Sequence, residues 1–194
     1  MHLQEIIRQE SSKESRKVNK EFMADTKSNE ILIIILKAHL YIERELIKTL
    51  TETIIDEKVL SNTTFRQKLE LANSMGLVDG YYGTLGKVNS IRNSYAHDIN
   101  YVFDEKVFED LLSTLPKEEK EDYLLEYETW KAMLYDGTIP EFNFRLQLLL
   151  NNIWFAMRAC RAFARKAIEL TLEEKQIELM SKFLPKEEIN VSEE

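Results

Sequence analysis

An all-α fold is predicted by three features of the sequence. Long stretches are rich in Glu, Lys, Leu and Ile, and no run alternates Val, Thr and Tyr in the manner of a strand. The 194 residues include only five Gly and three Pro, so strong turn signals are rare. The chain is also 44% hydrophobic, which suits one domain with a sizeable core. We therefore expect a single-domain bundle of about five to seven helices.

The chain divides into three parts. Residues 1–27 mix a few apolar side chains with many charges and are expected to form a weakly amphipathic helix or arm. Residues 28–183 are expected to form the helical bundle domain. Residues 184–194 are acidic and are expected to be a disordered tail.

The most apolar helix is predicted at residues 30–56. Ser28 or Asn29 can cap it, and Ile31–Leu36 is apolar on all sides, which is typical of a helix buried on most faces. A short helix is predicted next, at residues 65–75.

The start and end of that short helix carry local signals. Thr64 and Gln67 have the spacing of a capping box, and Gly76 stands where a C-terminal cap is expected.

Four further helices follow from caps and spacing. Leu85, Val88 and Ile91 give an inward face to a helix that runs from Tyr82 to His97. Asp104 is placed to cap a helix, and Pro116 to open another. The predicted ranges are 82–97, 105–112, 117–134 and 140–182, the last either continuous or broken near Thr171.

Composition excludes several classes of function. The net charge of −8 argues against broad coating of nucleic acid, although it is compatible with a local basic cleft. The single Cys160 excludes an internal disulfide, fits a reducing compartment, and is interpreted as a small buried hydrophobe. The first twenty residues carry no apolar signal-peptide core, and no apolar run approaches the ~20 residues of a membrane span. We therefore expect a cytoplasmic protein without a membrane partner.

The residues best suited to chemistry gather at Ser90–Asp98. Within it, Arg92 offers a fork of donors to a phosphate, and His97 can transfer protons near neutral pH. Five residues turn a helix by about 500°, so the two side chains would lie about 140° apart on a perfect helix. They can converge only if the helix loosens or ends there, or if a second subunit completes the site. The alternative is an ordinary helix end, where the dipole favours cations.

A basic stripe is predicted on the long C-terminal helix. Arg158, Arg161 and Arg165 recur at i, i+3 and i+7, and Lys166 lies beside them. Such a stripe could follow an RNA backbone. The alternative is a solvated face paired with the acidic helix Glu118–Glu128.

Neither a metal nor another cofactor is expected. His39 and Glu43 stand at i and i+4, but no second histidine or cysteine accompanies them at ligand spacing. The chain also has no Gly-rich phosphate loop and no Cys pair. His39 is therefore expected to be a buried, hydrogen-bonded residue. The alternative is that His39, together with Glu43, Asp98 and Tyr95, contacts the motif residues and holds them in position without touching a substrate.

The motif itself resembles a known pattern. Ile91-Arg92-Asn93, followed by Ser-Tyr-Ala-His97, is similar to the Arg-x4-His motif of the HEPN superfamily, in its form with Asn directly after Arg. These small all-helical proteins occur in toxin–antitoxin, abortive-infection (phage-defence) and RNA-processing systems. The helical setting from Glu30 to Phe108 is similar as well.

This resemblance implies a metal-independent endoribonuclease, active as a homodimer in which the motif helices of two subunits face each other. His97 would act on the 2′-hydroxyl or on the leaving oxygen, Arg92 would hold the scissile phosphate, and Asn93 would position one or both. The substrate would be RNA, cut to a 2′,3′-cyclic phosphate. A cognate antitoxin or regulatory protein is a further expected partner. Members paired with a nucleotidyltransferase antitoxin carry a Tyr two residues after the His; here that position is Ile99, which argues against regulation of that kind.

The chain is also similar to the mannitol operon repressor family, which has the same order of helices and a related Arg…His spacing. That group is described as regulatory. It implies the alternative function, a non-catalytic regulatory or protein-interaction dimer.

Overall fold

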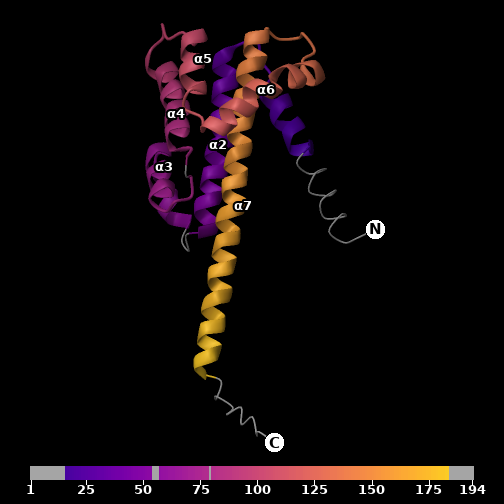
Figure 1. Cartoon of the computed structure of the whole chain (residues 1–194). Helices are drawn as coiled ribbons and strands as arrows, with labels where there is room; N and C mark the ends of the chain where they lie inside the picture. Colours follow the sequence, from indigo (N-terminus) through magenta and orange to yellow (C-terminus); the bar gives the residue numbers. More distant parts are fainter. Residues whose placement is uncertain (1–15, 54–56, 79, 184–194) are drawn as a thin grey trace, which may run out of the picture.

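The computed structural model describes residues 16–53, 57–78 and 80–183, and this part of the chain contains helices and no strand (Figure 1). The all-α prediction is thereby confirmed for the described residues. The predicted acidic tail, residues 184–194, lies outside them, as do residues 1–15 of the predicted N-terminal arm. After a helix at 16–26, the elements are α2 (Ile31–Thr53), the 3₁₀ helix η1 (Glu57–Leu60), α3 (Phe65–Ser74), α4 (Tyr82–His97), α5 (Glu105–Leu112), α6 (Lys117–Leu134) and α7 (Glu141–Phe183).

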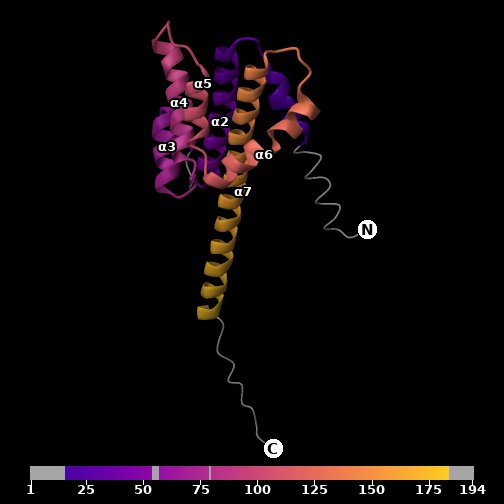
Figure 2. The ribbon, with the colours of Figure 1, turned by 45° about the horizontal axis from the view of Figure 1, so that its top comes forward.

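The core is built around α2 and the first part of α7, which lie side by side in both views (Figures 1 and 2). The two helices share the apolar interior that the sequence predicts for residues 30–56. The core-facing positions of α2 recur about every four residues, which places them on one stripe of the helix. The fully buried members of that stripe are Ile34, Ala38, Ile42, Leu46 and Leu50.

The remaining helices cover two sides of this pair. Helices α3, α4 and α5 lie on one side of α2 and the helix at 16–26 on the other, while α6 crosses α7 from the first side toward the second (Figures 1 and 2). Leu85, Val88 and Ile91 of α4 are buried as predicted. This orientation leaves another face of α4 to line a pocket.

Local signals fix the ends of the short helices. The predicted capping box is present: the Gln67 N–H donates to Thr64 Oγ1 at 3.3 Å, and the Thr64 N–H donates to Gln67 Oε1 at 2.8 Å. Asp104 accepts from the Val107 N–H at 2.9 Å and so caps α5. Gly76 follows α3 with a φ of +69°, a left-handed conformation that favours glycine.

Helix α7 is continuous through Thr171, so of the two predicted forms the unbroken one is correct. Its first part is buried against α2, and the last buried side chain described on it is Met157. The C-terminal end of α7 extends past the other described helices (Figures 1 and 2). In the described part of the chain, no helix is both long enough and apolar enough to cross a membrane.

Candidate functional site

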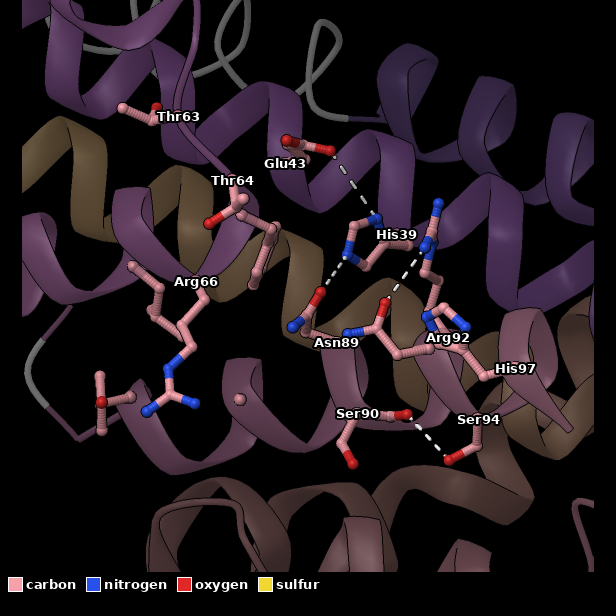
Figure 3. A pocket seen from close by; sticks show the side chains of 15 residues that line it. His39, Glu43, Thr63, Thr64, Arg66, Asn89, Ser90, Arg92, Ser94 and His97 are labelled. Atoms are coloured by element: carbon pink, nitrogen blue, oxygen red, sulfur yellow. Dashed lines mark hydrogen bonds and ion pairs between the residues drawn. The ribbon is translucent and has the colours of Figure 1, made fainter.

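A pocket of about 910 Å³ lies between α2, α3 and α4 (Figure 3). This volume is within the range of small-molecule and substrate sites. The pocket brings together residues from the motif, from the apolar helix and from the segment around the start of α3. Its lining residues are His39, Glu43, Thr63, Thr64, Phe65, Arg66, Leu69, Tyr82, Gly86, Asn89, Ser90, Arg92, Asn93, Ser94 and His97.

Arg92, Asn93 and His97 all line this pocket within a single chain. Helix α4 stays regular to its end, because the Asp98 N–H still donates to the Ser94 carbonyl at 2.9 Å. His97 is the last helical residue, and its exposed position together with the length of the Arg92 side chain lets both reach the same space. The ~140° separation expected on a perfect helix therefore does not keep them out of one pocket.

The guanidinium of Arg92 is held by its neighbour. Arg92 Nη1 donates to Asn93 Oδ1 at 3.1 Å, and both residues are half-buried. This bond uses one of the five donors of the guanidinium and limits its rotation, which leaves other donors for a ligand. Asn93 thus contacts the guanidinium that it is expected to position. His97 is the basic residue of the last turn of α4.

His39 forms part of the pocket wall and is only 5% exposed. Its Nε2 is hydrogen-bonded to Asn89 Oδ1 at 3.3 Å, and its ring packs against Phe65 with centroids 4.6 Å apart. Burial lowers the pKa of His39 below 6.5, although Glu43, 3.9 Å from Nδ1, opposes the shift. The imidazole is therefore neutral at neutral pH, as expected of a buried, hydrogen-bonded histidine.

A buried ion pair supports the same wall. Lys68 Nζ lies 3.0 Å from Glu43 Oε1 and also donates to the Thr63 carbonyl at 2.9 Å. Lys68 is 7% exposed, so its charge depends on these two partners. The pair joins α2 to α3 and neutralises the carboxylate of Glu43. The positive charges of Arg66 and Arg92 are then not offset by this acid.

Two residues expected behind the motif do not line the pocket. Asp98 accepts from the Asn100 N–H at 2.9 Å and so shapes the turn after α4. Tyr95 packs edge-on against Tyr101, with ring centroids 4.8 Å apart, and burial raises the pKa of Tyr95.

The basic stripe of α7 also lies apart from the pocket, because none of its four residues is in the pocket lining. Arg158 lies over the ring of Trp154 at 5.2 Å, and Arg161 pairs with Glu45 of α2 at 3.1 Å. Arg165 and Lys166 both pair with Glu169, at 3.2 and 3.6 Å. These acidic partners lie on α2 and on α7 itself, rather than on the acidic helix α6 that the alternative interpretation named.

Sequence reasoning missed three residues that shape the pocket: Lys68, Asn89 and Arg66. Tyr82, which the sequence offers as an aromatic side chain for base stacking, also lines the pocket. Asn89 stands three residues before Arg92, so its place on the same helix face could have been predicted. Lys68 and Arg66 belong to α3, and their place at the pocket depends on the packing of α3 against α2 and α4, which no local pattern encodes.

The described residues contain no group of three or more His, Cys, Asp or Glu side chains that could hold a metal ion. Comparisons with family models, with curated proteins and with solved structures found no match to this chain. The geometry of the pocket and the resemblance of its motif therefore carry the functional argument.

Proposed function

We propose that this protein is a metal-independent endoribonuclease whose active site is the pocket between α2, α3 and α4. The observation that carries the proposal is the presence of Arg92, Asn93 and His97 in the lining of one open pocket of about 910 Å³. Arg92 offers hydrogen-bond donors to a phosphate, Asn93 orients the Arg92 guanidinium, and His97 can transfer protons. These are functions that cleavage of an RNA phosphodiester uses.

The reaction balances without a metal. The 2′-oxygen of a ribose loses its proton and attacks the adjacent phosphorus, while the bond from phosphorus to the 5′-oxygen breaks and that oxygen gains a proton. His97 accepts the first proton or supplies the second, and solvent makes up the other transfer. Arg92 donates to the phosphate oxygens, where negative charge grows in the transition state. The products are a 2′,3′-cyclic phosphate and a 5′-hydroxyl, so DNA, which has no 2′-hydroxyl, is not cleaved.

The charges and the length of the pocket favour a short single strand of RNA. In a chain of net charge −8, Lys68 neutralises Glu43 in the pocket wall, and Arg92 supplies a positive charge beside it, while Arg66 pairs with Glu70 at 2.9 Å. Arg66 lies at the opposite end of the pocket from Arg92 and His97 (Figure 3). Tyr82 to His97 spans about 22 Å of helix, at a rise of about 1.5 Å per residue. Tyr82 is 41% exposed and offers a face on which a base can stack.

An activity of this kind fits a toxin or phage-defence protein of the cytoplasm, restrained by a cognate antitoxin or regulatory protein. The competing function, a non-catalytic regulatory dimer, makes the opposite prediction for the motif. It requires that loss of Arg92 or His97 leave the biological effect intact.

The test is cleavage of total cellular RNA in excess EDTA. Wild type is compared with His97→Ala and with Ile99→Ala, a matched control because Ile99 is 98% exposed two residues further on and outside the pocket. Cleavage by wild type and by the Ile99 variant, with none by the His97 variant, supports the proposal. Equal cleavage by all three proteins would show that a contaminating nuclease cuts the RNA, and the proposal would be rejected.

A further inference from the structure

The second part of α7 carries apolar side chains away from the bundle. No described side chain of α7 after Met157 is buried. Phe163 is 77% exposed, Leu172 61% and Ile177 68%. In both views the C-terminal end of α7 stands beyond every other described helix, whereas the stretch around Arg161 still lies beside α2 (Figures 1 and 2). A helix without tertiary contacts is marginally stable in water, so such an arm is expected to pack against something.

One face of the arm already forms half of a groove. A hollow of about 720 Å³ lies between α7 and the segment that follows α3, where Met75 and Leu77 contribute apolar surface. Its wall on α7 includes Cys160, Ala164, Ile168 and Leu172, which recur every four residues and so form one stripe. A continuous apolar strip rimmed by charges marks an interaction surface.

The charges beside this stripe change sign along the helix, so the stripe is complementary to a second copy of itself that runs in the opposite direction. Before Ile168 the helix carries Arg165 and Lys166, besides Arg161, which pairs with Glu45 of α2. After Ile168 it carries Glu169, Glu173 and Glu174 and one lysine, Lys175, so this half is mainly acidic. Two such helices packed antiparallel place each basic half beside the acidic half of the other. A parallel pair would place like charges together.

We propose that a second copy of the chain docks on this groove, with the two α7 arms packed antiparallel about a two-fold axis near Ile168. Arg165 of each copy then lies across from Glu169 of the other, and these join the pairs already present within each helix at 3.2 Å. Leu172 of each copy covers the small side chains Ala164 and Cys160 of the other. This interface differs from the one across α4 that the resemblance implies, and it does not depend on RNA cleavage.

Light scattering of the full chain over a range of concentrations tests the interface. The expected mass is twice the 22.9 kDa of one chain, and Leu172→Glu is expected to return it to the single-chain value with unchanged helical circular dichroism. Leu125→Glu on α6 is the matched control, because Leu125 is 81% exposed and distant in sequence from the arm. The control is expected to remain dimeric.

A charge exchange tests the register and does not depend on how Leu172→Glu folds. Arg165→Glu and Glu169→Arg are each expected to be monomeric, since each gathers four like charges at the two-fold axis. An equimolar mixture of the two variants is expected to form dimers. A wild-type monomer, or a dimer that survives Leu172→Glu and both charge variants, would overturn the proposal and leave the groove to another occupant.

Discussion

Removal of the Lys68 charge tests how the pocket wall is held. The change is Lys68→Met, which keeps the length of the side chain and deletes the ammonium. Glu43 then loses its partner at 3.0 Å, and the Thr63 carbonyl loses a donor at 2.9 Å. Breaking a fully buried pair costs about 3–5 kcal/mol. Because a quarter of the Glu43 side chain is exposed, water can replace part of the interaction, and we expect a loss of about 1–3 kcal/mol.

Urea unfolding followed by circular dichroism measures this loss. The midpoint is expected to fall at an unchanged m-value, and the melting temperature to fall by about 2–4 °C for each kcal/mol. The double variant Lys68→Met/Glu43→Leu removes both charges, so it is expected to be more stable than the sum of the single effects by at least ~1 kcal/mol. Arg66→Gln breaks an exposed pair with Glu70 and serves as the control, with no change of midpoint. Additive single effects, or a Lys68 variant as stable as the control, would refute the reasoning.

Three further predictions follow from single contacts. Burial keeps the pKa of His39 below 6.5, so below that pH the unfolded chain binds a proton that the folded chain does not. The contribution of His39 to the free energy of unfolding is therefore complete above about pH 6.5 and falls as the pH drops toward the folded pKa. His39→Gln is expected to flatten this part of the pH dependence of stability, measured by urea unfolding. Arg66→Gln is made in a His97→Ala background, which is expected to bind RNA without cutting it. The association constant for single-stranded RNA, measured by fluorescence anisotropy, is expected to fall less steeply with salt, with the slope of log K against log salt smaller in magnitude by ~0.7. An unchanged slope would exclude a phosphate contact by Arg66. Thr64→Ala removes a helix cap and is expected to cost ~1 kcal/mol in the same urea assay, whereas a variant as stable as wild type would show that α3 does not need the cap.

The helices could be predicted because their signals are local. Asp104 caps the helix that it was expected to cap, and α4 begins and ends at the predicted Tyr82 and His97. The burial of Leu85, Val88 and Ile91 also follows from spacing alone.

The central residues of the site could be predicted because they share one helix, and His39 and Glu43 of α2, which were expected to support them, also line the pocket. Arg92, Asn93 and His97 are neighbours on α4, so the sequence brings them together without knowledge of the fold. Lys68 and Arg66 belong to α3, and their place at the pocket depends on how α3 packs against α2. The partner of Arg161 likewise lies on another helix, at Glu45, more than a hundred residues earlier in the chain.

The arm of α7 shows a different limit. The apolar side chains of its buried part, such as Leu149 and Ile153, and those of its exposed part, such as Ile168 and Leu172, follow similar helical spacing. Periodicity identifies an apolar face but does not say whether the same chain or another one covers it. In the structure the last ion pair between α7 and α2 is that of Arg161 with Glu45 and Glu52, close to the end of α2 at Thr53.

The most direct test of the proposed chemistry is cleavage of a short single-stranded RNA that carries a 2′-deoxy sugar at one position. In EDTA, wild type is expected to cut the all-ribose strand to fragments that end in a 2′,3′-cyclic phosphate, identified by mass spectrometry. The bond that follows the deoxy sugar is expected to stay intact, while the other bonds are cut at their usual rates. Cleavage at the deoxy position, or products that end in a 3′-hydroxyl, would contradict attack by the 2′-oxygen and with it the roles proposed for His97 and Arg92.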